Sequence, residues 1–207
     1  MRNVAVMGLG NFGTALACNW LAEGLSVSGW TVEQEVYDSI QATGINEKYL
    51  DDVSLEGLKV SMDIAQSVAD AEVVVLALPS HVVLSVVDDL LPHLRNDQII
   101  LDLAKGLAPG DQMISEVIRE KLEAAKLCCR LCVMMGPTIA PELARGVFTT
   151  ALVTGDDVTL AGELAAILTT KTLKLSAATD SLGSEYWGAF KNVIALACGV
   201  VDGLKSD

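Results

Sequence analysis

A glycine-rich turn near the start of the chain carries the first chemical signal. Gly8, Gly10 and Gly13 stand in the spacing GxGxxG, after a short apolar run at residues 2–7 and before an alanine- and leucine-rich segment at residues 14–23. In a strand–turn–helix unit, such glycines allow a tight turn, close approach of backbone N–H groups to a pyrophosphate, and close packing of helix on strand. The pattern predicts a dinucleotide site, and a turn with only a structural role is the alternative.

Two lysines stand where an ammonium group could move a proton. Lys105 follows the end of an apolar run in a Lys-Gly turn, and Lys191 lies between Phe190 and Asn192 in an apolar helical segment. A solvated surface charge is the ordinary role of a lysine, but the helical neighbours of Lys191 are nearly all apolar. Desolvation and a second ammonium nearby lower the pKa of a lysine, which lets it protonate a carbonyl oxygen or take a proton from an alcohol.

The cysteines and histidines give a weaker signal. Cys129 and Cys132 have the spacing of a redox or zinc pair, but no second pair of Cys or His residues accompanies them. The segment at residues 127–135 is typical of a buried strand, in which a thiol acts as a small apolar group. His81 and His93 stand apart from any carboxylate cluster. We therefore predict structural thiols and no metal site.

Alternating strand and helix patterns must position these residues. Continuous apolar runs at residues 71–78 and 98–103 are typical of central parallel strands covered on both faces. Further strands are expected at residues 25–30, 59–61, 127–135, 149–153 and 171–175, and helices at 33–44, 63–69, 82–91, 110–125, 141–146 and 158–168. This alternation predicts the α/β class, with a doubly wound, mostly parallel sheet of the Rossmann type. Ligands bind such sheets at the carboxyl ends of the strands.

The last segment, residues 181–207, shows no strand pattern. Within it, residues 190–201 are apolar nearly all round a helix, which is typical of a helix buried against other protein. We expect that its cover belongs either to a missing part of the chain or to a partner chain.

Composition excludes several classes of protein. The chain has 207 residues, of which 51% are apolar, so it can bury a core and is not disordered. A formal charge of −13 and a pI of about 4.4 oppose binding to nucleic acid. The longest apolar runs, at residues 73–79 and 193–201, fall short of the roughly 20 residues of a membrane span, and no signal pattern opens the chain. We expect a soluble, cytoplasmic protein.

The end of the second expected strand bears on the choice of cofactor. An acidic residue at this place suits a free 2′-hydroxyl, and an arginine suits a 2′-phosphate. Trp30, Thr31 and Val32 stand there, followed by Glu33. Glu33 is either a ribose ligand or an acid that favours the start of a helix, so the choice between NAD and NADP stays open.

Six ordered motifs resemble those of NAD(P)-dependent glycerol-3-phosphate dehydrogenase, and together they cover essentially the whole chain. They are GLGNFGTALA at residues 8–17, Asn46 with Tyr49-Leu50, LPSH at 78–81, AKGL at 104–107, MGPTIAPELA at 135–144, and KNVIA at 191–195 with Asp202-Gly203. The resemblance implies reversible reduction of dihydroxyacetone phosphate to sn-glycerol 3-phosphate, at the entry to glycerophospholipid synthesis. It implies NAD or NADP as cofactor and a small-molecule phosphate as substrate.

The resemblance also implies roles for matching residues. Lys191 corresponds to the general acid/base at the reacting oxygen, and Lys105 to a lysine that contacts substrate and cofactor. Substrate contacts are implied for Gly136 and Thr138, and cofactor contacts for Gly8, Gly10, Asn11, Phe12, Gly13 and Ala140. A cationic acid in this position would stabilise and protonate the oxygen on which negative charge grows.

Two features depart from the family pattern. Val32 stands where the family often carries a basic or polar residue, which puts recognition of a 2′-phosphate in doubt. Relatives also continue far beyond Asp207 as a helical domain whose arginine and asparagine clamp the substrate phosphate. We therefore expect a dinucleotide-binding domain at residues 1–180 and, at residues 181–207, the first helix of a truncated all-helical substrate domain.

The missing clamp leaves two alternatives to that enzyme. One is a stand-alone NAD(P)-binding module without turnover, possible as a homodimer through the apolar C-terminal helix. The other is reduction of a different 2-oxo or 3-hydroxy acid by a related fold, which does not account for Gly136-Pro137-Thr138 and Lys191-Asn192 together.

Overall fold

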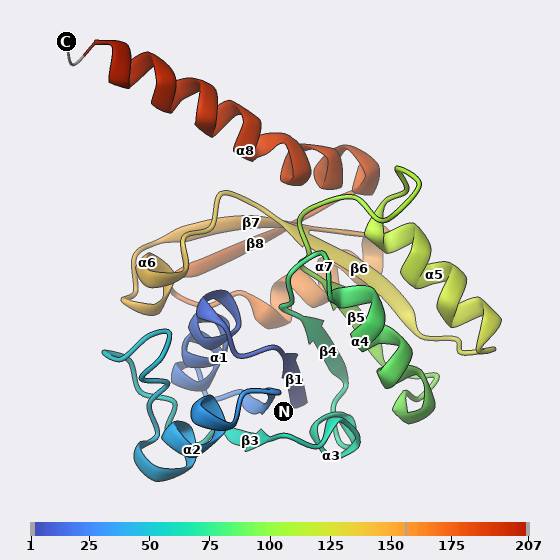
Figure 1. Ribbon diagram of the computed structural model, residues 1–207. Coiled ribbons are helices and arrows are strands. Elements are labelled where there is room, and N and C mark those ends of the chain that lie inside the picture. The colour runs from blue at the N-terminus through green and yellow to red at the C-terminus, as the bar shows by residue number, and fades with distance from the viewer. Residues whose placement is uncertain (1–2, 156, 206–207) are drawn as a thin grey trace.

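An eight-stranded sheet forms the centre of the protein, whose computed structural model describes residues 3–155 and 157–205 (Figure 1). The strands are β1 (Asn3–Met7), β2 (Ser26–Trp30), β3 (Lys59–Ser61), β4 (Val73–Leu76), β5 (Ile99–Asp102), β6 (Arg130–Met135), β7 (Thr149–Gly155) and β8 (Leu173–Ala178). Their order is β3-β2-β1-β4-β5-β6-β7-β8, and every neighbouring pair is parallel except the antiparallel pair β6 and β7. The predicted doubly wound, mostly parallel sheet is confirmed.

Helices cover both faces of the sheet. They are α1 (Asn11–Ala22), α2 (Gln34–Thr43), α3 (Ile64–Val68), α4 (Val83–Leu90), the 3-10 helix η1 (Leu91–His93), α5 (Ile114–Ala124), α6 (Ala140–Ala144), α7 (Val158–Leu168) and α8 (Ser181–Leu204). Side chains of α1, α2, α6 and α7 belong to one buried apolar cluster, and those of α3, α4 and α5 to the other. Along β1, Val4 and Val6 face the first cluster while Ala5 and Met7 face the second. Both faces of the central strands are therefore covered, as their continuous apolar sequences require.

The helix starts show how local chemistry sets the element boundaries. α1 begins at Asn11, three residues before the predicted start, because Gly10 takes the N-cap position with an extended backbone. The predicted cap of α3 is confirmed, since the carboxylate of Asp63 accepts hydrogen bonds from the backbone N–H groups of Ala65 and Gln66 at 2.8 and 3.2 Å. Both starts place a helix directly after a strand, as the doubly wound arrangement needs.

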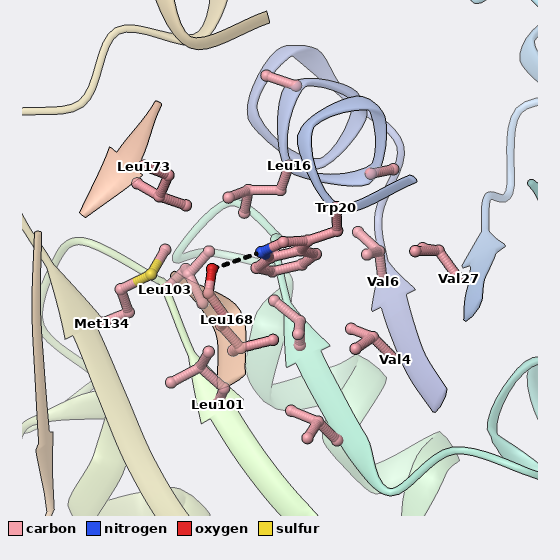
Figure 2. Packing of buried hydrophobic residues seen from close by; sticks show 14 of the residues in the cluster. Val4, Val6, Leu16, Trp20, Val27, Leu101, Leu103, Met134, Leu168 and Leu173 are labelled. Atoms are coloured by element: carbon pink, nitrogen blue, oxygen red, sulfur yellow. Dashed lines mark hydrogen bonds between the residues drawn. The ribbon is translucent and has the colours of Figure 1, made fainter. Parts of the chain in front are cut away.

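A buried tryptophan joins the two halves of the sheet on one face. Trp20 of α1 is fully buried among apolar side chains of β1, β5, β6 and β8 (Figure 2). Its indole N–H donates to the carbonyl oxygen of Leu168, at the end of α7, at 3.0 Å. This bond satisfies the one polar atom of the ring, so the tryptophan anchors α1 to the distant part of the chain without leaving an unpaired donor.

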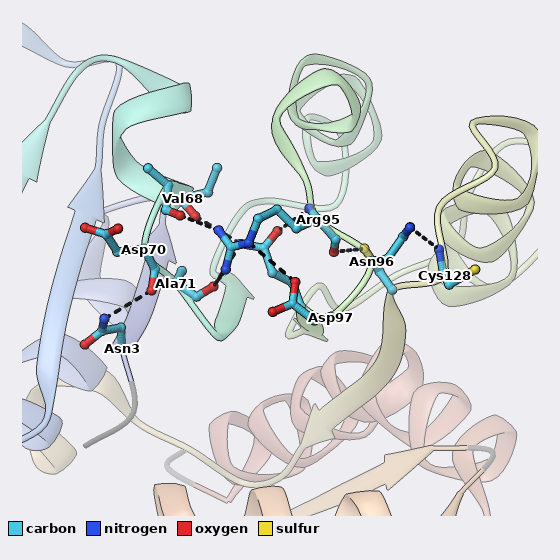
Figure 3. Close-up of polar contacts among 11 residues, drawn as sticks. Asn3, Val68, Asp70, Ala71, Arg95, Asn96, Asp97 and Cys128 are labelled. Atoms are coloured by element: carbon cyan, nitrogen blue, oxygen red, sulfur yellow. Dashed lines mark hydrogen bonds and ion pairs between the residues drawn. The ribbon is translucent and has the colours of Figure 1, made fainter.

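Polar contacts fasten the amino-terminal edge of the sheet (Figure 3). The guanidinium of Arg95, in the turn before β5, donates to the carbonyl oxygens of Ala69 and Ala71, the latter at 3.0 Å. The side-chain amide of Asn3 donates to Asp70 O at 3.1 Å, and Asn96 accepts from the backbone N–H of Cys128 at 2.9 Å. Side chains therefore pair backbone groups at this edge, opposite the carboxyl ends of the strands where ligands bind.

Helix α8 departs from the rest of the structure. It projects away from the sheet, with the C-terminal end far from the other elements (Figure 1). Its exposed large apolar side chains are Leu182, Tyr186, Trp187, Phe190, Val193, Ile194, Leu196, Val200, Val201 and Leu204. The apolar surface is as predicted, and the part of the chain that the structure describes does not cover it.

The length of α8 exceeds the short apolar runs seen in the sequence. Its 24 residues, with a mean hydropathy of 1.2 over an 18-residue window, make it the one described helix that reaches membrane-spanning length and apolarity. A core helix of a soluble protein can share that length and composition, so these two properties alone do not assign α8 to a membrane.

Candidate functional site

Two positions of the glycine-rich turn between β1 and α1 have no room for a side chain. Gly8 has φ of +100°, and a Cβ there would lie 2.7 Å from the carbonyl oxygen of Ala77. A Cβ on Gly13 would lie 1.9 Å from the carbonyl oxygen of Gly8. These two glycines let the turn close against β4 and against the first turn of α1.

The third glycine of the motif has a different surrounding. A Cβ on Gly10 would meet nothing within 4 Å, and no side chain caps the N-terminus of α1. The start of a helix offers free N–H groups and partial positive charge, and here open space adjoins it. The residues present therefore fit the pyrophosphate of a dinucleotide.

A buried asparagine supports this turn from outside the motif. Asn46, in the connection after α2, donates from its side-chain amide to Leu9 O and to Thr14 Oγ1, both at 2.8 Å. The Thr14 hydroxyl in turn donates to Leu9 O at 3.1 Å. Asn46 appeared in the sequence only as part of a motif, and no local pattern indicated this role, because the contact spans 37 positions of the chain.

An acidic cluster lies at the end of β2, where the adenosine half of a dinucleotide is expected. Glu33 takes the N-cap position of α2, but its side chain does not cap the helix. Its two carboxylate oxygens accept instead from Lys48 Nζ at 2.6 Å and from the Tyr49 hydroxyl at 2.8 Å, and Lys48 also pairs with Glu35. The bond to Lys48 is the main reason that the pKa of Glu33 lies below its ordinary value, which keeps the group an anion.

Lys105 lies where the carboxyl ends of β5 and β6 and the start of α1 meet. Its ammonium group is 3.5 Å from both Gly136 O and Thr138 Oγ1, in the turn after β6. It also lies 5.7 Å from the centre of the Phe12 ring, in the first turn of α1. The structure thus brings Lys105, Gly136, Thr138 and Phe12 together, although they are far apart in the sequence.

Lys191 reaches the same place from α8. Burial, followed by the positive charge of Lys191 and direct contact with it, lowers the pKa of Lys105 to about 8. Close packing of α8 on β6 makes this approach possible, because a Cβ on Gly188 would lie 2.7 Å from the sulfur of Met135. Two lysines that three strands separate along the chain therefore share one site.

A cavity of about 680 Å³ adjoins Lys191, between α8 and the last strands of the sheet. Gly136 and Pro137 line it from the turn after β6, and Thr150 and Leu152 from β7. A Cβ on Gly136 would lie 2.8 Å from the carbonyl oxygen of Thr150, so this position needs a glycine. The cavity gives a small ligand space beside the ammonium group of Lys191.

The remaining predicted positions lie around the same edge. Asn11 is exposed in the first turn of α1, and Ala140 opens α6, a helix that packs beside α1. A Cβ on Gly106 would lie 3.0 Å from the Cβ of Ser80, so the loop with His81 runs beside the Lys-Gly turn. Asn11 and Ala140 are thus the first residues of two neighbouring helices at this edge.

The cysteine pair does not form a site. Cys132 belongs to the buried cluster on one face of the sheet, while Cys129 packs against the cluster on the other face. The Cys129 thiol donates to Arg95 O at 3.0 Å. Within residues 3–155 and 157–205, no group of three or more His, Cys, Asp and Glu residues is arranged to hold a metal ion.

The arrangement can bind an anion and deliver a proton. Two ammonium groups and an uncapped helix N-terminus lie at one edge of a protein whose formal charge is −13. A small anion attracted there would meet Thr138 and Gly136 on one side and the glycine-rich turn on the other. With a pKa near 8, Lys105 can also exchange a proton at physiological pH.

Comparison with known proteins gives one consistent result. The sequence pattern of the NAD-dependent glycerol-3-phosphate dehydrogenase N-terminus matches residues 3–161, and that of the C-terminus of the same enzymes matches residues 180–207. Glycerol-3-phosphate dehydrogenase [NAD(P)+] of Syntrophotalea carbinolica is 36% identical over 204 residues, and that of Clostridium perfringens is 33% identical over 206. These alignments cover 98% and 99% of the chain.

The solved structures agree. The crystal structure of glycerol-3-phosphate dehydrogenase from Coxiella burnetii superposes with a TM-score of 0.89 at 29% identity, covering all of this chain and 62% of that one. The chain likewise spans 61% of the length of the two curated relatives.

Proposed function

The chain belongs to the NAD-dependent glycerol-3-phosphate dehydrogenase family, and from this premise we propose that it interconverts dihydroxyacetone phosphate and sn-glycerol 3-phosphate with NAD(H) or NADP(H). One observation carries the proposal: Lys105 and Lys191 meet beside Gly136 and Thr138, at the edge that also holds the dinucleotide turn. The metabolic role that we propose is supply of glycerol 3-phosphate for glycerophospholipid synthesis, in the cytoplasm.

We assign the proton transfer to Lys191 and the anchoring of substrate and cofactor to Lys105. Lys191 lines the cavity that would take the substrate, so its ammonium group is placed to protonate the oxygen that becomes a hydroxyl. Gly136 and Thr138 form the wall beside Lys105. The nicotinamide cofactor, when bound, supplies the hydride for the reduction.

The cofactor would be held by the turn between β1 and α1 and by the elements beside it. Gly8 and Gly13 shape the turn, and Gly10 leaves the space that a pyrophosphate needs. We assign Asn11, Phe12, Lys105 and Ala140 to the rest of this surface, because they stand at the start of α1, the end of β5 and the start of α6.

We divide the chain into a dinucleotide-binding domain at residues 1–180 and the start of a helical substrate domain at residues 181–207. The separate sequence matches, to residues 3–161 and 180–207, support a boundary near the start of α8. The exposed apolar surface of α8 also supports it, since a helix of this kind is stabilised by further packing.

Oxidation of NADH and of NADPH in the presence of dihydroxyacetone phosphate tests the activity. The assay is run on this chain and on the longer product if the reading frame continues past codon 207. We expect turnover in the form that contains the residues binding the substrate phosphate. In that form, Lys191→Ala should lower kcat at least about 100-fold. Absence of turnover with both cofactors in the longest form would contradict the assignment.

The exposed apolar surface of α8 supports a second candidate, a dinucleotide-binding module that pairs through this helix. Such a module binds NADH without turnover and forms a homodimer. Sedimentation at tens of micromolar, combined with the activity assay, distinguishes the two candidates. A monomer that reduces dihydroxyacetone phosphate excludes the module.

A further inference from the structure

A buried carboxylate ties α8 to the helix that follows the Lys105 turn. Glu185, in the second turn of α8, is only 4% exposed. Its Oε2 accepts from the Ser115 hydroxyl at 2.6 Å, and its Oε1 accepts from the backbone N–H of Ser115 at 3.4 Å. The two residues are 70 positions apart, and the start of α8 lies beside the start of α5 (Figure 1). No role for Glu185 follows from the catalytic assignments above.

The contact adds an acceptor to the N-terminus of α5. Within the helix itself, the Glu116 carboxylate accepts from the backbone N–H of the N-cap residue Met113 at 2.8 Å, but Met113 has no side-chain oxygen for the N–H groups that follow. Glu185 accepts from one of those groups, and an anion at a helix N-terminus is favoured by the helix dipole. Burial raises the pKa of Glu185, while the bonds from Ser115 act in the opposite direction. Burial is the larger of the two effects, so the pKa of Glu185 lies above its ordinary value.

Both lysines lie within a short distance of this contact along the chain. The turn with Lys105 leads into α5. The start of this turn is fixed by Asp102, whose Oδ1 accepts from the backbone N–H of Ala104 at 3.0 Å. Lys191 follows Glu185 by less than two turns of the same helix. The bond between Glu185 and Ser115 thus joins the segment that carries one lysine to the segment that carries the other.

The first half of α8 packs on β6 and β7, for example through Gly188 on Met135, and beyond Lys191 the helix is exposed. Apolar packing of this kind is not directional, whereas a hydrogen bond fixes the orientation of the helix that carries it. Glu185 makes such a directional contact.

We propose that Glu185 is a positioning residue: by capping α5 from α8, it sets the distance between Lys191 and Lys105. The inference rests on the proposed function for its catalytic meaning, but not for its geometry. Loss of the Glu185 contact should let α8 swing, so that the ammonium groups separate and Lys105 becomes more accessible to water.

The acid–base behaviour of Lys105 tests this geometry without turnover. The rate of acetylation of Lys105 by acetic anhydride, followed by mass spectrometry against pH, reports its pKa. We expect Glu185→Ala to raise that pKa from about 8 by at least one unit, which at pH 8 slows labelling about fivefold. Removal of a negative charge would by itself lower a lysine pKa, so the expected direction marks movement of α8.

Three variants calibrate the result. Lys191→Ala gives the change produced by removing the second ammonium entirely, and Glu185→Gln, which keeps an acceptor for Ser115, should stay nearer the wild type than Glu185→Ala. Glu123→Gln removes one carboxylate from an exposed position of α5 and should leave labelling unchanged. If Glu185→Ala does not fold, Ser115→Ala removes the same 2.6 Å bond from the other side.

The outcomes decide the proposal. A raised Lys105 pKa in Glu185→Ala or Ser115→Ala, with Glu123→Gln unchanged, supports it. An unchanged pKa in those variants, alongside a clear change in Lys191→Ala, overturns it. In a form with turnover, the positioning role further predicts a loss of about tenfold in kcat with KM for NADH within about twofold. If dihydroxyacetone phosphate is not reduced at all, the proposed function fails while the labelling result stands.

Discussion

Trp20 and Trp187 show how differently two regions of this chain are stabilised. Trp20 is 0% exposed and hydrogen-bonded between α1 and α7, whereas Trp187, in α8, is 69% exposed. The region from β1 to β8 buries large apolar side chains on both faces of a sheet. In α8, the large apolar side chains have no such cover in the described part of the chain.

This difference separates what holds the fold from what completes the site. The proposed cofactor side lies within this region, where the glycine turn and Asn46 are fixed by internal contacts. The proposed proton donor, Lys191, lies on α8, which packs on β6 and β7 and is bonded to Ser115 through Glu185. We expect substitutions in the first region to act mainly on stability and cofactor affinity, and those in α8 to act mainly on the geometry of the two lysines.

The two tryptophans give the largest expected contrast. Trp20→Ala should lower the free energy of unfolding by about 3–5 kcal/mol, because it leaves a cavity in a close-packed core and an unpaired Leu168 carbonyl. Trp187→Ala should change it by less than about 0.5 kcal/mol, since the ring is already in water. Urea unfolding followed by far-ultraviolet circular dichroism measures both. Equal losses would show that α8 is packed in solution and would remove the contrast.

The glycines of the dinucleotide turn separate stability from cofactor affinity. Gly13→Ala should cost about 1–3 kcal/mol of stability and abolish NADH binding, because its Cβ would clash with the carbonyl of Gly8. Gly10→Ala should cost only about 0.5–1 kcal/mol, because alanine is a poorer N-cap than glycine, yet weaken NADH binding at least about tenfold by filling the open space. Fluorescence titration with NADH provides the affinities. Unimpaired NADH binding by Gly10→Ala would place the pyrophosphate elsewhere.

Asn46 tests whether the turn depends on a residue outside its own motif. Asn46→Ala should cost about 1–2 kcal/mol, because Leu9 O loses a donor in a buried place, and NADH affinity should fall with it. Asn96→Ala, which removes an acceptor from an exposed backbone N–H, should cost less than about 1 kcal/mol and leave NADH binding intact. If the two variants behave alike, the glycine turn holds its own shape.

Lys105 lies at the junction of the two regions and gives the smallest expected effect. Its pKa of about 8 in the folded chain lies below the ordinary value of 10.5, so the charged form is disfavoured on folding. Lys105→Met should therefore raise Tm at pH 7 by about 2–4 °C, a gain that should shrink from about pH 8 and vanish near pH 10.5, where the unfolded chain also loses this proton. Differential scanning fluorimetry across this range measures it. Lys174→Met, at an exposed position of β8, is the control and should show no such pH-dependent gain.

Local patterns predicted the elements well because their causes are local. The apolar runs at residues 71–78 and 98–103 contain β4 and β5, and Asp63 caps α3 as its sequence indicates. The antiparallel direction of β7 had no such signal, because pairing direction depends on how the connection through α6 returns to the sheet. The start of α8 at Ser181, before the predicted apolar stretch, depends on capping by Asp180.

The candidate site divides in the same way. The sequence pointed to the glycine turn, to both lysines and, by resemblance, to Gly136 and Thr138, since each stands in a motif or after a strand. It gave no sign that Asn46 holds the turn or that Glu185 caps α5, because each contact joins residues 37 or 70 positions apart. The partners of Glu33 were also hidden, since Lys48 and Tyr49 reach it across a loop.

By itself, then, the sequence determined how strands and helices alternate along the chain, where the glycine-rich turn stands, and which family the chain resembles. All of these follow from short-range spacing and from motifs in a fixed order. Only the tertiary structure decided that Lys105 and Lys191 share one site and that Glu185 is buried against Ser115. The reason is physical: periodicity reports which side of an element is apolar, whereas contact and burial depend on what the folded chain brings against that side.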